Sequence, residues 1–397
     1  MTATVPRVLT LNAGSSTLRF ALVEAAEPPR VLLRGKIERI GMPGTRCTVV
    51  DSQAAAPQEV PIPATSRAAV SWLFDWLVAQ PAFEGVCVVA HRIVHGMAHT
   101  APARVTPELL ADLRRMMPFD PEHLPFEIEL ITVSLQRYPA LQQLACFDTA
   151  FHRGMPMVAR RLPIPREYYA LGIERYGFHG LSFAFLMEEL VRLQDPAAIQ
   201  GRVILAHLGN GASLAAVRDG RSVDTSMGFT PASGMMMGTR SGDLDPGLAH
   251  YLAQTQQMDT ARFQHMVNHD SGLLGVSGIS ADMRDLLAQE AAEPRAAEAI
   301  ALFCYCARKW IGAFAAALGG LDTLVFAGGV GENAPLIRER ICSDLAFIGI
   351  ELDAAANARS AALISRPGSG VGVRVIRTDE ELMLARSALL LYTQGMN

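Results

Sequence analysis

The sequence predicts an α/β protein of two related domains, and a repeated strand–turn–strand pattern is the first reason. Within residues 7–23, V-L-T-L, N-A-G-S-S and T-L-R-F-A-L-V read as a buried strand, a turn of small residues and a second strand. Residues 203–217 repeat this plan with V-I-L-A-H-L, G-N-G-A-S and L-A-A-V. A length of 397 residues is enough for two domains that each bury a core. A third glycine turn, F-A-G-G-V-G-E-N at residues 326–333, follows another apolar strand, as expected where strands alternate with helices.

Composition and charge exclude several classes of protein. Hydrophobic residues make up 50% of the chain and charged residues 19%, which is typical of a globular protein. A formal net charge of −4 gives no electrostatic sign of a nucleic-acid partner. No apolar run reaches the roughly 20 residues of a membrane span, and the N-terminus lacks a signal-peptide pattern. We therefore expect a cytoplasmic enzyme without a membrane partner.

The other elements follow from apolar periodicity and from turn residues. Helices are predicted at residues 66–79, 107–117, 124–136, 181–193, 246–255, 260–269, 294–318 and 335–345. Strands are predicted at residues 86–90, 144–147, 203–208, 323–326 and 373–377. Residues 53–63 are polar and contain proline, which predicts an exposed loop. A last helix should run to Leu391, with Thr378 as its N-cap and Glu381 completing a capping box.

Several features indicate a site that handles phosphate. Gly209-Asn210-Gly211 reads as a tight turn at which backbone N–H groups can approach an anion closely. Arg240 lies between Gly238 and Gly242 in an irregular loop, where a guanidinium can meet a transferring phosphoryl group. Only two of the basic residues are lysines, and neither has a G-K-[ST] context, which excludes a P-loop mechanism. Phosphate charge must then be met by arginine, backbone amides and a metal ion.

Polar residues at the ends of the predicted strands allow two interpretations each. Asn12, in a polar turn with Ser15–Thr17, could belong to an ordinary hairpin or could hold phosphate or metal-bound water. Asp148 could bind Mg²⁺ at the edge of the sheet or cap a helix. Arg92 beside a strand end needs an anionic partner, for which a small carboxylate substrate is one candidate.

Histidines and paired acids give further candidates. His179 and His207 each stand beside a glycine turn and can donate to phosphoryl oxygens, although a lone histidine is more often a core residue. His91 and His95 are spaced i, i+4 without a suitable third ligand, which does not favour a metal site. Glu380-Glu381 opens a helix, where the dipole favours acids, but this explains one acid better than two.

Together these motifs resemble the acetate kinase family with its propionate kinase relatives. Five motifs occur in the family's order and span nearly the whole chain: N-A-G-S-S-T-L-R-F, H-R-I-V-H-G, F-D-T-A-F-H, H-L-G-N-G-A-S with T-R-S-G-D-L-D-P-G, and A-G-G-V-G-E-N with T-D-E-E-L. The resemblance implies two duplicated α/β domains of the actin, Hsp70 and sugar-kinase type that face a nucleotide cleft, in a homodimer. We expect residues 1–149 plus 380–397 to form the N-terminal domain and residues 150–379 the nucleotide-binding domain.

The resemblance also implies an activity and a set of site residues. The reaction would be a reversible, Mg²⁺-dependent transfer of the ATP γ-phosphoryl group to a short carboxylate, acetate first, with Mn²⁺ as a possible substitute. Motif matching assigns catalysis to Arg92, Asp148, His179 and Arg240, and the metal to Asn12 and Glu380. The acyl pocket beside Arg92 would comprise Val94, Phe119, Phe178 and Pro231. Contacts with ATP or ADP would come from Arg19, His207, Leu208, Gly209, Asn210, Gly211, Asp282, Met283, Arg284, Gly328, Gly329, Val330, Gly331 and Asn333.

The chain departs from the family's usual motifs at several positions. Where the family reads P-L-H-N-P, residues 118–123 read P-F-D-P-E-H, so either Asp120 replaces the motif's histidine or His123 has taken its place. The family's H-G-G-E becomes H-G-M-A at residues 95–98, and T-N-E-E becomes T-D-E-E. Met283 stands where an adenine-side phenylalanine is usual. These changes bear on rate and acyl preference and leave the core residues in place.

Two other classes of function stay open beside propionate or another short acyl substrate. One is a kinase of the same fold that acts on a sugar or a longer carboxylate. It would need a catalytic aspartate to activate a hydroxyl group, and the small apolar pocket argues against sugars. The other is a nucleotide-dependent binding or regulatory protein in which the change at Asp120 has disabled phosphoryl transfer.

Overall fold

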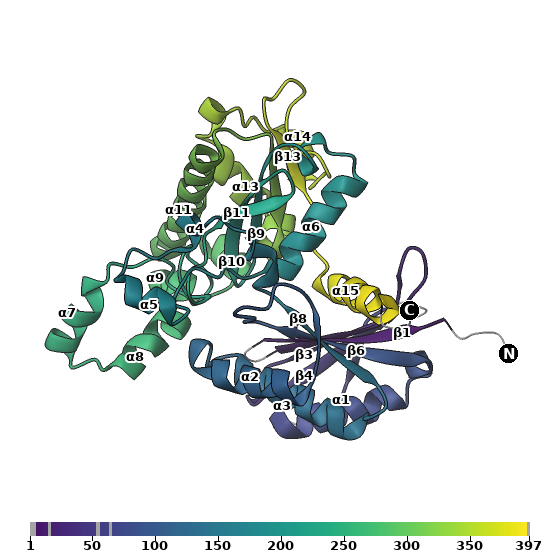
Figure 1. Ribbon diagram of the computed structural model, residues 1–397. Helices are drawn as coiled ribbons and strands as arrows, with labels where there is room; N and C mark the ends of the chain where they lie inside the picture. Colours follow the sequence, from purple (N-terminus) through teal and green to yellow (C-terminus); the bar gives the residue numbers. More distant parts are fainter. Residues whose placement is uncertain (1–4, 15–16, 53–55, 63–65, 395–397) are drawn as a thin grey trace. The chain divides into compact units, whose positions relative to one another are not determined.

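The computed structural model describes residues 5–14, 17–52, 56–62 and 66–394, and the chain divides into two compact units. The first unit comprises Met1–Ala150 together with Asp379–Asn397, and the second comprises Phe151–Thr378. In Figure 1 the first unit is coloured purple to blue, and the yellow C-terminal helix belongs to it. The first unit is therefore assembled from both ends of the chain.

The first unit contains one sheet of mixed direction. Its strand order is β5-β4-β3-β2-β1-β6-β8-β7. Strands β1 to β5 are joined as antiparallel neighbours, whereas β6 runs parallel to β1 and β8 runs parallel to β6. The strands are β1 Arg7–Ala13, β2 Thr17–Glu24, β3 Arg30–Glu38, β4 Arg46–Asp51, β5 Gln58–Val60, β6 Val86–Ile93, β7 Ala103–Arg104 and β8 Gln142–Phe147.

The second unit repeats the central part of that topology. Its strand order is β11-β10-β9-β12-β13, with β9, β10 and β11 antiparallel and with β12 and β13 parallel to β9. The same order and directions occur in the first unit as β3-β2-β1-β6-β8. The strands are β9 Arg202–Leu208, β10 Ala212–Arg218, β11 Arg221–Thr225, β12 Thr323–Ala327 and β13 Gly372–Val375. The duplication predicted from the two strand–turn–strand segments is thus confirmed at the level of sheet topology.

Helices cover both faces of the first sheet, as Figure 1 shows, with α1, α2 and α3 on one face and α15 on the other. Phe74 and Leu77 of α1 are fully buried and join strand residues such as Leu9 and Phe20 in one apolar core. The helices are α1 Ser66–Val78, α2 Pro107–Met116, α3 Leu124–Arg137 and α15 Glu380–Gln394. Short 3₁₀ segments lie at Pro81–Phe83, Met117–Phe119 and Ala150–His152.

In the second unit α6 and α11 flank the sheet (Figure 1). The helices are α4 Met157–Arg160, α5 Arg166–Ala170, α6 Gly180–Arg192, α7 Gly247–Gln256, α8 Thr260–His265, α9 Gly272–Ser277, α10 Met283–Gln289, α11 Pro294–Leu318, α12 Gly328–Asn333, α13 Pro335–Cys342 and α14 Ala354–Ala358. Pro196–Ala198 and Ala346–Ile348 form 3₁₀ turns, and Met266–Asp270 forms a π-helical turn. The bounds of α11 agree with the predicted helix at residues 294–318.

Four predicted elements need correction. The predicted helix at 260–269 is α8 followed by the π-helical turn, and the one at 335–345 ends at Cys342. The glycine turn at 326–333 is instead the end of β12 followed by a short helix, α12, because Gly328 takes a left-handed φ of +77° that lets the chain turn into it. The predicted loop at 53–63 contains β5, which pairs with β4, and its residues 53–55 and 63 lie outside the described part of the chain.

The predicted cap of the last helix was also wrong. The Asp379 side chain accepts a hydrogen bond from the Leu382 N–H at 2.9 Å, which makes Asp379 the N-cap of α15. Thr378 instead bonds to residues of the second unit. Asp379 also forms an ion pair with Arg34 of β3, so this residue fixes the start of α15 against the first sheet.

Helix α11 has the length and composition that a membrane-spanning helix would need, and it is the one such helix among the described residues. The expectation that no apolar run reaches that length therefore needs correction. Its position in the second unit explains its composition, because it packs on β9, β10, α9, α10 and α13. Side chains such as Phe303, Ile311 and Phe314 are buried in these contacts.

Candidate active site

The first unit brings three of the predicted site residues to one edge of its sheet. β1, β6 and β8 are parallel neighbours, and Asn12, Arg92 and Asp148 lie at or just beyond their carboxyl ends. Ligands of open α/β sheets bind beyond this edge, where the strand ends converge. Ser15 and Ser16, which follow Asn12 in the predicted turn, lie outside the described residues.

Arg92 is the centre of this group. Its guanidinium donates to Asp148 Oδ2 at 2.7 Å and to the Ala13 carbonyl at 2.9 Å. The side chain is 12% exposed, whereas those of Asp148 and Glu127 are 1% exposed. Burial would lower the pKa of Arg92, but the neighbouring carboxylates of Asp148, Glu127 and Glu380 outweigh burial and raise it. The anionic partners that the sequence required for Arg92 are therefore present within the protein.

Glu127 of α3 belongs to this group and was missed by the sequence analysis. Its two carboxyl oxygens accept from the Val94 N–H at 3.0 and 3.2 Å, and Oε1 lies 3.8 Å from Arg92 Nη1. Burial raises the pKa of Glu127 to about 8, and Arg92 opposes this rise. The available signal was a glutamate on the apolar face of α3, at the same face as the buried Leu124 and Ile131.

The raised pKa of Glu127 predicts a pH-dependent stability. A carboxyl group whose pKa lies higher in the folded state than its ordinary 4.5 binds its proton more tightly when folded. Its stabilisation is therefore complete below pH 4.5 and is lost as the pH rises through about 8. We expect the unfolding free energy of wild type to fall between pH 5 and pH 9 more than that of Glu127→Gln, measured by urea denaturation.

The matched control for this experiment is Glu129→Gln on the same helix, which should follow wild type at both pH values. Parallel wild-type and Glu127→Gln curves would show that Glu127 has an ordinary pKa in the folded protein and would contradict the burial argument.

Glu380 and Asn12 form the part of the first unit that could hold a metal. Asn12 Nδ2 donates to Glu380 Oε2 at 2.8 Å and to Glu381 Oε1 at 3.2 Å. Burial raises the pKa of Glu381, and the adjacent Glu380 adds to the rise. No group of three His, Cys, Asp or Glu suited to a metal occurs among the described residues. A carboxylate beside an amide group, as Glu380 and Asn12 provide, suits Mg²⁺, which usually takes one or two carboxylates and completes its shell with phosphate and water.

His91 is engaged within the core. Its Nε2 lies 2.8 Å from Gln143 Oε1, and burial lowers the pKa of His91 to about 4. His95 is fully buried, and its Nδ1 accepts from the Met97 N–H at 3.2 Å. These contacts give both histidines a structural role beside Arg92.

In the second unit the predicted turn between β9 and β10 is present. Strand pairing brings Ala212 opposite Leu208, and the Gly209 N–H donates to the Gly211 carbonyl at 3.0 Å. His179 Nε2 lies 3.4 Å from the position that a Cβ on Gly211 would take, and Arg240 Nη1 lies 3.9 Å from it. The turn, His179 and Arg240 are thus one cluster of potential phosphate donors.

His179 of this cluster and the neighbouring His207 are each held by a serine. His179 Nδ1 lies 2.8 Å from Ser213 Oγ, and His207 Nδ1 lies 2.8 Å from Ser182 Oγ. The two imidazole rings stack with centroids 4.3 Å apart. His179 has a left-handed φ of +58°, which is unusual for a residue with a side chain and is often found at functional sites. Both histidines are half-buried, and each is oriented by its serine beside the turn at residues 209–211.

Arg240 lies in an irregular segment, residues 226–246, as predicted. This segment is tied by hydrogen bonds, including Asp243 Oδ1 accepting from the Gly234 N–H at 2.8 Å, and Met235 and Met237 anchor it in the core. The Arg240 guanidinium lies within 3.5 Å of the Pro231 carbonyl. The backbone is thus fixed while the half-buried side chain extends towards the turn at residues 209–211.

The residues expected to hold adenosine have mixed environments. Gly328 must be glycine, because a Cβ there would come within 2.7 Å of the Leu208 carbonyl oxygen. Gly329 has open space around its Cα, and Asn333 Nδ2 donates to the Gly329 carbonyl at 2.9 Å. The remaining expected contacts differ in exposure: Asp282 caps α10, Met283 is buried, Arg284 is 89% exposed, Val330 is half-buried, and Gly331 and Leu208 are buried. Arg19 of β2 belongs to the first unit and is exposed.

The four expected acyl-pocket residues are divided between the units. Val94 is buried at the end of β6, and the Phe119 ring lies 5.8 Å from that of His95. Phe178 is 1% exposed, and its carbonyl lies 3.1 Å from His152 Nε2. Pro231 lies in the same irregular segment as Arg240 and is half-buried. Val94 and Phe119 belong to the first unit, and Phe178 and Pro231 belong to the second.

The sequence around His123 matches the family's P-L-H-N-P motif in a second register. Pro121-Glu122-His123-Leu124-Pro125 has the Pro-x-His-x-Pro spacing of P-L-H-N-P without any deletion. His123 is buried at the start of α3, and its Nδ1 lies 2.9 Å from Asp120 Oδ1. In this register Asp120 is the partner of the motif histidine and not its replacement.

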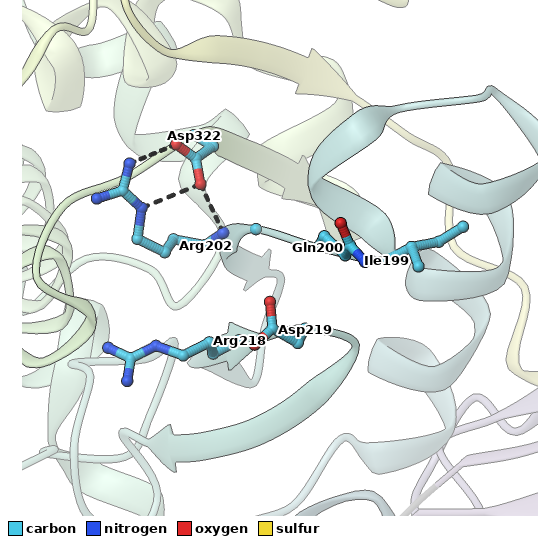
Figure 2. A pocket seen from close by; sticks show the side chains of 7 residues that line it. Ile199, Gln200, Arg202, Arg218, Asp219 and Asp322 are labelled. Carbon is cyan, nitrogen blue, oxygen red and sulfur yellow. Dashed lines mark hydrogen bonds and ion pairs between the residues drawn. The ribbon is translucent and has the colours of Figure 1, made fainter.

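A pocket lined by polar residues lies elsewhere in the second unit (Figure 2). It has a volume of about 680 Å³ and is lined by Ile199, Gln200, Gly201, Arg202, Arg218, Asp219 and Asp322. Asp322 accepts from the Arg202 side chain at 3.0 Å and from its backbone N–H at 2.7 Å. Arg202 begins β9, and the turn at residue 209 follows its other end, roughly 20 Å away for a strand of this length. This pocket is therefore separate from the phosphate-directed cluster.

The two units share one strand order, and each has polar residues at the carboxyl ends of its strands. These features define a duplicated two-domain α/β protein of the actin, Hsp70 and sugar-kinase class.

The sequence profile of the Acetokinase family matches residues 7–386. An acetate kinase of Rhodopseudomonas palustris (strain TIE-1) is 43% identical over 386 residues, which cover 96% of each chain. A propionate kinase of Citrobacter rodentium (strain ICC168) is 42% identical over 389 residues, again 96% of each. The crystal structure of a propionate kinase from Francisella tularensis matches with a TM-score of 0.91 and 34% identity, covering 97% of this chain and 99% of the other. The chain belongs to the acetokinase family.

Proposed function

We propose that this protein transfers the γ-phosphoryl group of ATP reversibly to the carboxylate of a short-chain acid, acetate by preference, and forms an acyl phosphate. The observation that carries the proposal is the cluster of His179, Arg240 and the turn at residues 209–211 in a chain that belongs to the acetokinase family over residues 7–386. The relatives named acetate kinase and propionate kinase support the class of substrate.

The reaction needs positioning and charge neutralisation from the protein. A carboxylate oxygen forms a bond to the γ-phosphorus, and the bond from that phosphorus to the bridging oxygen of ADP breaks. The carboxylate is already deprotonated, so no general base is required. Negative charge spreads over the equatorial oxygens in the transition state, where fixed donors stabilise it most.

We assign the roles as follows. Arg240 and His179 donate to the transferring phosphoryl group. His207, Asn210 and Gly211 contact the ATP phosphates. Arg92, held by Asp148 and Glu127, binds the substrate carboxylate, and His123 is the histidine of the family's P-L-H-N-P motif. Residues at the α12 and α10 ends would hold adenosine, which makes the second unit the nucleotide-binding domain.

We propose Mg²⁺ as the metal, with Mn²⁺ able to replace it. When bound with ATP the ion neutralises charge on the phosphates. The Glu380 carboxylate and the Asn12 side-chain oxygen are the ligands that suit it in the first unit. Asp148 lies at the same sheet edge and orients Arg92.

A homodimer is the proposed assembly, and the cytoplasm, where ATP and ADP are supplied, is the proposed location. Helices α7 and α8 contain no buried residue, Tyr251 of α7 is 61% exposed, and Leu244, which precedes α7, is 44% exposed. An exposed apolar surface of this kind supports association with a second copy. The molar mass measured by light scattering would test the dimer.

A hydroxamate assay for acyl phosphate tests the function. ATP and Mg²⁺ are supplied with acetate, propionate or butyrate in parallel, and a hexose is the fourth acceptor, for which phosphorylation is measured as ADP formation. We expect acyl phosphate with acetate and propionate and no phosphorylated sugar. Nucleotide binding without any acyl phosphate would favour a regulatory protein and would contradict the proposal.

The same assay tests acyl preference. Val94 and Phe119 are bulky, so a longer acyl chain should fit less well. One methylene in an apolar pocket is worth about 1–3 kcal/mol. We expect kcat/KM for acetate to exceed that for propionate by about tenfold, and a higher value for propionate or butyrate would refute the pocket assignment.

A further inference from the structure

A chain of hydrogen bonds behind His207 has no role in the assignments above. Ser182 of α6 is fully buried, and its Oγ lies 2.8 Å from His207 Nδ1 and 2.8 Å from Thr378 Oγ1. All three residues belong to the second unit, and Thr378 is its last residue. The contacts therefore join the end of β9, the start of α6 and the segment that leads into α15.

The single proton on each hydroxyl group allows two arrangements of this chain. In one, Thr378 donates to Ser182 and Ser182 donates to His207 Nδ1, so that the imidazole proton lies on Nε2. In the other, every donor and acceptor is reversed and Nε2 carries a lone pair. His207 Nε2 lies 3.6 Å from the position that a Cβ on Gly209 would take, so it is the nitrogen beside the phosphate-directed turn. Phosphate oxygens only accept hydrogen bonds, and they favour the first arrangement.

Thr378 also has a second connection. Its backbone N–H donates to Glu332 Oε1 at 3.1 Å, and the same oxygen accepts from the Gly328 N–H at 3.0 Å. Gly328 begins α12, the glycine-rich helix expected to contact adenosine. Thr378 is thus linked through Ser182 to His207 at the phosphate-directed turn and through Glu332 to the start of α12. A residue with both connections is held in one orientation.

We infer that Ser182 and Thr378 are positioning residues that keep the proton of neutral His207 on Nε2, so that His207 donates to a phosphate of the nucleotide. The inference rests on the proposed function only for the identity of the ligand, a nucleoside triphosphate. The property that it concerns directly is the tautomer of the His207 imidazole. Ser182 and Thr378 touch neither the substrate nor the reacting atoms in this role, and they act through His207.

Two measurements test the inference without phosphoryl transfer. The tautomer of His207 is read from the ¹⁵N chemical shifts of its imidazole, with His207→Gln used for assignment, in wild type, Ser182→Ala and Thr378→Val. ATP affinity is measured by calorimetry with Mg²⁺ and no carboxylate acceptor. We expect the Nε2–H form in wild type and a mixture of tautomers in Ser182→Ala, with ATP affinity lower by about tenfold or more, as for one lost hydrogen bond to a charged group.

Conservative and control variants separate the hydroxyl groups from packing. Thr378→Ser keeps the hydroxyl and should behave as wild type, whereas the isosteric Thr378→Val should show the loss. Thr255→Val removes an exposed threonine hydroxyl of α7, which donates to the Tyr251 carbonyl, and should change neither readout. An unchanged tautomer in Ser182→Ala, or equal losses in Thr378→Ser and Thr378→Val, would overturn the inference. Wild-type ATP binding with the Nε2–H tautomer but without acyl phosphate formation would leave the inference intact and refute the proposed function.

Discussion

Arg240→Ala is expected to lower kcat by about 10³- to 10⁵-fold, the range found for arginines that stabilise phosphoryl transfer. The guanidinium lies beside the turn at residues 209–211 and His179, so it can meet the charge that develops on the equatorial oxygens. Because that charge is largest in the transition state, ATP affinity should change much less than kcat. Arg240→Lys should recover little activity, since an ammonium group lacks the planar fork of donors.

Steady-state kinetics and ATP calorimetry measure the two effects separately, and circular dichroism establishes that the variants are folded. Arg221→Ala is the matched control, because Arg221 is an exposed arginine on β11 of the same unit. Near-wild-type turnover in folded Arg240→Ala would remove Arg240 from the mechanism and leave Arg92 as the remaining arginine candidate.

Arg92→Ala is expected to lower the unfolding free energy by about 3–5 kcal/mol as well as to abolish carboxylate binding. The substitution leaves the Asp148 carboxylate, which is 1% exposed, without its ion-pair partner, whereas Glu127 with its pKa of about 8 stays mostly protonated. A buried charge without a partner is the reason for the large loss. Urea denaturation measures the stability, and the KM for acetate measures the binding.

The double variant Arg92→Ala with Asp148→Asn distinguishes the two effects. It removes the unpaired charge of Asp148, so part of the lost stability should return while activity stays absent. Arg115→Ala, an exposed arginine paired with Asp112 on α2, should leave both quantities unchanged. Full stability in Arg92→Ala would show that the ion pair with Asp148 does not stabilise the folded state.

The fold could be predicted because its strongest signals are local. Apolar runs of strand length, glycine turns and the long apolar segment at residues 294–318 each specify an element without knowledge of its neighbours. The predictions were wrong where a contact distant in sequence decides the structure. The edge strand β5 exists because β4 pairs with it, and Asp379 replaces Thr378 as the cap of α15 because Ser182 and Glu332 bind Thr378.

The sequence by itself determined the duplicated α/β class, the family and the chemical types of the candidate residues, because each depends on residue identity and spacing along the chain. Only the tertiary structure decided which other side chains pair with the candidate residues and hold them in place. Glu127 lies 35 residues from Arg92 and Ser182 lies 196 residues from Thr378, and no spacing rule connects such pairs. Their roles arise because packing removes them from water, and a polar group buried there must find a partner wherever the fold places one.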